Sequence, residues 1–100
     1  MNDRELLELA ARAAGHAIDR IDAMHDPEDW ACWNPLEDDG DALRLAIKLG
    51  LMIVVWREEK MSYAGNEDWE GIFEKHQDSP AVATRLAIVR AAAAIGRRMP

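Results

Sequence analysis

The residues of this chain that could do chemistry are few, and they stand far apart among its 100 positions. Three histidines, His16, His25 and His76, and the single cysteine Cys32 are the side chains that a zinc ion would use, but no two have the short spacings of zinc sites. Cys32 also lacks a neighbouring base, and the acidic stretch around it disfavours a thiolate nucleophile. We therefore expect no metal, no cofactor and a Cys32 that packs as a small apolar side chain.

A run of acidic residues, EDDGD at positions 37–41, is the next candidate, as a calcium loop. With Gly40 at the sixth position of such a loop, Pro35 falls at the first and Ala46 at the twelfth, and neither supplies a carboxylate. Aspartates are also preferred where a helix begins, because they accept bonds from its unpaired N–H groups and complement its dipole. We therefore predict a helix cap at Asp38 or Asp39, within an acidic face formed by Asp38, Asp39 and Asp41.

An acid–base site is the remaining chemical alternative. It would make the protein a small enzyme or ligand-binding domain, with His16, Asp41 or His76 lining a pocket between sheet and helices. The chain has no glycine-rich phosphate loop and no Gly-x-Ser-x-Gly elbow, and nothing in the sequence brings the three residues together. We therefore predict a protein that is not an enzyme.

Charge and composition limit the partners. The net charge of −7 argues against direct binding of nucleic acid, which needs clustered Lys and Arg. Residues 19–41 carry nine acidic side chains against Arg20 alone, so an acidic nucleic-acid mimic that inhibits a host DNA-binding factor is an alternative function. The longest apolar-rich run, residues 45–56, is too short for the about 20 residues that cross a bilayer. With one cysteine and no leader-like segment, we expect a cytoplasmic protein without a membrane contact.

The elements that must position these residues can be read from caps and periodicity. Asn2 and Glu5 start a first helix that ends near Gly15, and Gly50 ends a second one. Ser79 and Pro80 announce the third, which runs to the arginines at 97 and 98. We expect strands at 30–33, 51–56, 61–64 and 71–75, with turns at 58–60 and 65–66 and the strand at 51–56 in the middle of the sheet. For residues 17–23 the spacing of Ile18 and Ile21 fits a helical turn, and a short, irregular strand is the other reading, which we adopt. The chain is thus predicted to be one α+β domain, with three helices and a small, mainly antiparallel sheet.

Three segments together carry a family resemblance. They are WNPLEDDGDALRLAIKLG at 33–50, ELLELAARAAG at 5–15 and SPAVATRLAIVRAAAAIGRRMP at 79–100. In this order they resemble the phage ABA sandwich domain, a family of small phage and prophage proteins of unknown function, over nearly the whole chain. The resemblance implies a layered α/β/α sandwich and a phage-encoded protein in the host cell, and it carries no active-site residues.

Tryptophan usage points to protein contacts. Trp56, within an apolar run, is predicted to be core, whereas Trp30, Trp33 and Trp69 stand beside turns, where peripheral core and contact surface both remain open. We predict a contact surface made of Trp30, Trp33, Asn34 and Trp69. The function expected is that of a small acidic accessory protein of a phage or prophage, acting through contacts with a phage or host protein.

The third helix is apolar around more than half of its circumference. One small sheet is not expected to cover the face formed by Ile88, Ala92 and Ile95. We therefore predict a homodimer, with this leftover face or a sheet edge in the interface. The alternative is a monomer in which the first helix covers the face.

Overall fold

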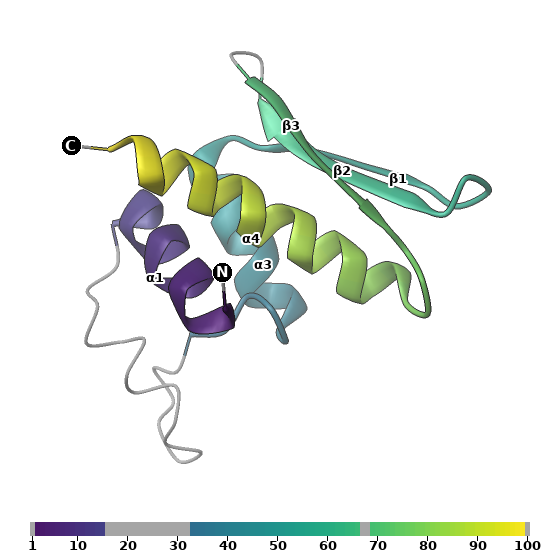
Figure 1. Ribbon diagram of the computed structural model, residues 1–100, viewed down its shortest axis with the longest axis horizontal. Coiled ribbons are helices and arrows are strands. Elements are labelled where there is room, and N and C mark those ends of the chain that lie inside the picture. Colours follow the sequence, from purple (N-terminus) through teal and green to yellow (C-terminus); the bar gives the residue numbers. More distant parts are fainter. Residues whose placement is uncertain (1, 16–32, 67–68, 100) are drawn as a thin grey trace.

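The computed structural model describes residues 2–15, 33–66 and 69–99. In chain order the elements are α1 (Asp3–Ala14), α3 (Asp39–Leu49), β1 (Met52–Trp56), β2 (Met61–Asn66), β3 (Trp69–Lys75) and α4 (Pro80–Arg98) (Figure 1). The predicted α+β class, with three helices and an antiparallel sheet, is confirmed for this part of the chain. The strand predicted at 17–23 lies outside the described residues, as does the strand at 30–33 apart from residue 33, which is in no strand.

The three helices begin where polar caps satisfy their first N–H groups. Asn2 accepts a bond from the Glu5 N–H at 2.8 Å, Asp38 from Asp41 at 2.7 Å, and Ser79 from Val82 at 3.2 Å. Gly15 and Gly50 end α1 and α3 in the left-handed region, with φ of 77° and 66°. Residues with a β-carbon adopt this conformation only at a cost in free energy. The helix bounds therefore follow from local signals.

The sheet has the order β1-β2-β3 with antiparallel neighbours. Strand β1 is thus an edge strand, and the prediction that it lies in the middle of the sheet is wrong. Strand β2 also continues through Gly65 and Asn66, where a turn was predicted. The ring of Tyr63 lies over Gly65 and Gly71, in the space that side chains at those positions would need. Strands β2 and β3 are therefore longer than predicted, because the two glycines lie within strands and not in turns. The pairing of β2 with β3 changes register between Ala64 and Asn66.

The described helices lie on one side of the sheet (Figure 1). Helix α4 crosses the inner face, and α1 and α3 pack against α4. The core joins these layers through small residues, since alanines on α1 and α4 let the two helices approach closely. Its members with the lowest exposure are Ala10, Ala11, Ala64, Ala87, Val89, Ala91 and Ala92.

Two predicted placements change because of this layering. Ile88 and Ala92 are only 3% and 0% exposed within the single chain, so the prediction that they form a face left over for a second copy is wrong. Ile95 is partly buried. The prediction for Trp56 is wrong in the opposite sense, because Trp56 is 38% exposed. Helix α4 packs against α1, α3 and the sheet, whereas no described element covers the other face of the sheet.

Candidate functional site

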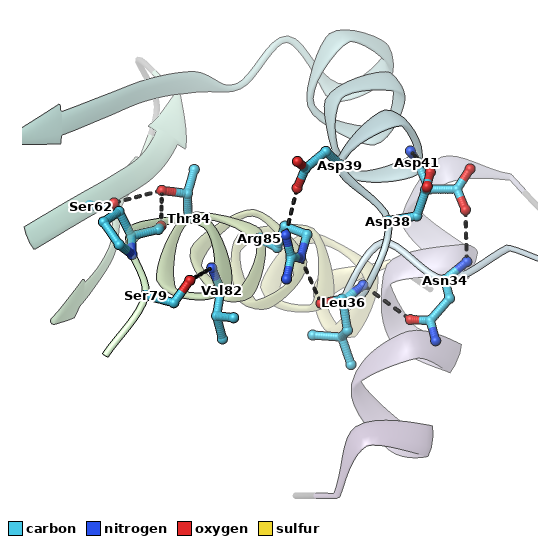
Figure 2. A network of polar contacts seen from close by, with 11 residues as sticks. Asn34, Leu36, Asp38, Asp39, Asp41, Ser62, Ser79, Val82, Thr84 and Arg85 are labelled. Carbon is cyan, nitrogen blue, oxygen red and sulfur yellow. Dashed lines mark hydrogen bonds and ion pairs between the residues drawn. The ribbon is translucent and has the colours of Figure 1, made fainter. Parts of the chain in front are cut away.

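The predicted tryptophan surface does not come together among the described residues. Trp33 is only 7% exposed and belongs to the core. Asn34 has a structural role: its backbone N–H donates to Asp41 Oδ2 at 2.9 Å, and its side-chain Oδ1 accepts from the Leu36 N–H at 3.1 Å (Figure 2). Trp69 opens β3 opposite Asn66, and Trp30 lies outside the described residues.

The predicted acidic face is engaged in contacts within the chain. Asp38 caps α3, and Arg44 donates to Asp41 Oδ1 at 2.7 Å. Asp39 accepts from Arg85 Nη1 at 2.6 Å (Figure 2). Each carboxylate thus has a cation or a backbone donor beside it, and the Asp41 side chain is only 14% exposed. The three aspartates hold the start of α3 in place.

Arg85 connects three parts of the fold. Its Nε donates to the Leu36 carbonyl at 2.9 Å while Nη1 binds Asp39, and its side chain is only 16% exposed (Figure 2). It lies along a groove of about 610 Å³ between α1, residues 34–37 and α4. The floor of this groove is apolar, with Leu7, Leu36 and Leu86. Arg85 therefore fastens the segment before α3 onto α4 through its bonds to Leu36 and Asp39.

A buried serine–histidine pair lies between β2, β3 and α4. Ser62 Oγ is 2.9 Å from His76 Nε2 and 2.7 Å from Thr84 Oγ1, and the two buried residues are 0% and 5% exposed. The Thr84 hydroxyl donates to the Pro80 carbonyl at 2.7 Å, so the Ser62 hydroxyl donates to Thr84. Ser62 then accepts from the His76 Nε2–H. This direction is opposite to that of a catalytic dyad, in which histidine takes the serine proton.

The acid–base trio considered from the sequence is not assembled either. His76 borders a pocket of about 310 Å³ at the start of α4, and Asp41 is not among the residues that line it. Asp41 instead lies in the first turn of α3, and His16 is outside the described residues. Within the described ranges, no group of three or more His, Cys, Asp or Glu side chains could hold a metal ion. No helix there is long and apolar enough to cross a membrane.

Exposed apolar side chains also lie on the face of the sheet that points away from α4. Cross-strand partners share a face, so the register places one set of side chains on this side. We call it the outer sheet face, and its residues are Met52, Val54, Trp56, Met61, Tyr63 and Phe73. Within this set, Met52, Trp56 and Phe73 are 52%, 38% and 56% exposed.

The aromatic residues of the outer sheet face contact one another. The rings of Trp56 and Phe73 are stacked, with centroids 6.2 Å apart and an angle of 10° between their planes. The Tyr63 ring is 4.9 Å from Phe73 and tilted by 54°. Tyr63 in turn lies over Gly65 and Gly71. The three rings thus contact one another on a face that no described element covers.

The outer sheet face is not among the predicted sites, although the sequence carries a signal for it. Residues 52, 54 and 56 alternate with the α4-facing residues of the same strand, as 61 and 63 do on β2. The side chains on both faces of residues 51–56 are apolar, so the sequence alone predicts a strand that is buried on both faces. Only the presence or absence of a helix layer distinguishes a buried face from an exposed one.

Comparison of the chain with protein-family models, curated proteins and solved structures finds no match. The resemblance to the phage ABA sandwich domain therefore stays a prediction.

Proposed function

We propose that this protein is a non-catalytic accessory protein that binds another protein through its outer sheet face. The observation that carries the proposal is the exposed aromatic cluster of Trp56, Tyr63 and Phe73 on a face that no described element covers. A phage or prophage origin is part of the proposal and rests on the family resemblance alone.

The composition of this face suits a protein partner. Large exposed apolar patches on soluble domains mark contact sites, and tryptophan, tyrosine, phenylalanine and methionine are enriched at them. The one charged residue that the register places on the face is Lys75, opposite Met61. An apolar centre with a cation at its rim is the arrangement expected of a binding surface.

The cluster is also ordered before it binds. Trp56, Phe73 and Tyr63 contact one another, and Tyr63 is held over two glycines. Side chains whose rotamers are already fixed lose little entropy when a partner covers them, which favours affinity. The two alternatives have less support. Of the acidic residues at 19–41 on which the mimic rests, Asp39 and Asp41 are paired with arginines of the chain, and residues 19–32 lie outside the described part of the structure. The Ser62–His76 pair is oriented against proton removal from serine.

The test compares two charge substitutions at positions of nearly equal exposure. Phe73→Glu alters the outer sheet face, whereas the control, Val82→Glu, alters α4 on the helix side, where Val82 is 52% exposed and Phe73 is 56% exposed. Each variant and the unaltered protein are used to capture partners from the cells that produce the protein. A captured protein is then purified and its binding measured by calorimetry.

We expect Phe73→Glu to weaken that binding at least tenfold, because it leaves a charge in an apolar contact, and Val82→Glu to leave it unchanged. Equal binding by Phe73→Glu and the unaltered protein would contradict the proposal. So would loss of binding in Val82→Glu alone, which would point to the grooves that border α4.

A further inference from the structure

Strand β1 has an edge without the features that usually keep sheet edges from pairing. Its sequence, Met-Ile-Val-Val-Trp, contains no charge, proline or glycine, and β2 is its only partner among the described strands. The opposite edge differs, because β3 contains Glu74 and Lys75, a glycine at φ 84° and an irregular register. Soluble proteins protect exposed edges with such charges and irregularities, so β1 has the properties of a strand that pairs with another chain.

The surface beside this edge is apolar as well. Leu43 and Ile47, one turn apart on α3, are 55% and 70% exposed, and Val55 on the inner face of β1 is 43% exposed. Leu43 and Val55 also line a groove of about 470 Å³ between α3, α4 and β1. No described part of the chain covers these exposed side chains. An additional strand beside β1 would lie next to the groove.

We propose that the occupant of this edge is a second copy of the chain, paired antiparallel through β1 around a twofold axis at Val54. The two sheets then form one sheet of six strands. In this register Ile53 faces Val55 of the second copy on the inner side, and Met52 faces Trp56 on the outer side. A β-branched pair and a methionine–aromatic pair are both favourable across strands.

Two arguments favour a second copy over another partner. First, the strand is complementary to itself, since every residue of β1 meets an apolar residue in this register, and each contact is made twice. Second, the axis places α3 of both copies on the same side of the joined sheet, and Leu43 of each copy lines the groove beside β1 together with Val55.

The exposed apolar area near the β1 edge indicates a small dimer interface. Five apolar residues line the edge, and they are Leu43, Ile47, Met52, Val55 and Trp56, with exposures between 38% and 70%. At about 200 Å² for a fully exposed large side chain, they offer about 500 Å² per copy. This is below the about 800 Å² per partner of a standard interface, so we expect a weak dimer whose association is followed from micromolar concentration upward. Because each copy carries a net charge of −7, salt strengthens the association by screening repulsion.

This dimer goes beyond the proposed function, since it would join two outer sheet faces into one continuous platform. Sedimentation equilibrium from micromolar to millimolar concentration tests it. We expect the mass to rise from 11.2 kDa toward twice that value, and more readily at high salt. Ile47→Glu and, separately, Val55→Lys should raise the dissociation constant at least tenfold, whereas Phe73→Glu should leave it unchanged.

A cysteine pair identifies the seam. With Cys32→Ser as background, Val54→Cys should give a covalent dimer on mild oxidation, because residues directly opposite in antiparallel strands have β-carbons about 4.5–5.5 Å apart. The control is Phe73→Cys, which is exposed but lies on the far strand β3. Circular dichroism checks that each variant is folded.

Three outcomes would overturn the proposal. One is a mass of 11.2 kDa at every concentration and salt, together with β1 amides protected from hydrogen exchange, which would mean that the chain itself covers the edge. Another is a dimer that neither Ile47→Glu nor Val55→Lys weakens. The third is faster cross-linking by Phe73→Cys than by Val54→Cys, which would place the seam on the outer sheet face. Loss of partner binding by Phe73→Glu without loss of the dimer would separate the two proposals.

Discussion

Gly96 of α4 lies against the backbone carbonyl of Leu9 on α1, with no room for a β-carbon between them. Both sides of this contact are backbone, because Gly96 has no side chain. Neither side can therefore relieve a clash by changing a side-chain rotamer. Gly96 is buried, and both helices bury several alanines where they pack together. The close crossing of the two helices therefore depends on this one glycine.

We predict that Gly96→Ala destabilises the protein by about 1–3 kcal/mol, as expected when atoms are forced into a packed contact. Helix propensity alone predicts the opposite sign, a gain of up to about 1 kcal/mol. Urea unfolding followed by circular dichroism distinguishes the two. A midpoint that moves to higher urea would show that the helices separate easily and that the crossing is not tight.

The Arg85 contacts with Leu36 and Asp39 should stabilise the packing of the α3 start on α4. Arg85→Met keeps most of the apolar stem but leaves the Leu36 carbonyl without this donor, and we expect a loss of about 1–3 kcal/mol. The matched control is Arg44→Met, which removes an ion pair to Asp41 from a side chain that is 72% exposed. That change should cost less than about 0.5 kcal/mol. Equal losses in the two variants would contradict the structural role of Arg85.

The buried Ser62 hydroxyl should matter for stability. Ser62→Ala removes the acceptor of the His76 Nε2–H and the donor to Thr84, and we expect a loss of about 1–3 kcal/mol in the free energy of unfolding. Thr84→Ser keeps a hydroxyl at the other end of the network and should cost less. The measurement is again urea unfolding. Unchanged stability in Ser62→Ala would mean that water replaces the lost hydroxyl.

The outer sheet face should contribute little to stability, in contrast to the core. Phe73→Ala removes an exposed ring, and its cross-strand contacts account for about 0.2–1 kcal/mol. Leu45→Ala removes a side chain that is 2% exposed and should cost about 2–5 kcal/mol. Thermal unfolding of both variants gives the comparison. A loss in Phe73→Ala as large as that in Leu45→Ala would show that the aromatic cluster is part of the folding core.

Local sequence by itself determined where the helices begin and end. Asn2, Asp38 and Ser79 accept bonds from N–H groups three residues further along, and Gly50 adopts its left-handed conformation because it has no β-carbon. These interactions involve residues only a few positions apart. They form in much the same way whatever else the chain packs against. For this reason the three described helices could be predicted from the sequence.

Burial was decided by the tertiary structure. Trp33 and Trp56 are the same residue type, yet one is 7% exposed and the other 38%. Ile88 is covered because α1 and α3 both pack on α4, while Phe73 is uncovered because the described helices lie on the other side of the sheet. The periodicity of a sequence states which residues share a face. Which faces meet depends on contacts between segments distant in the chain, and the candidate site lies on the face that those contacts leave open.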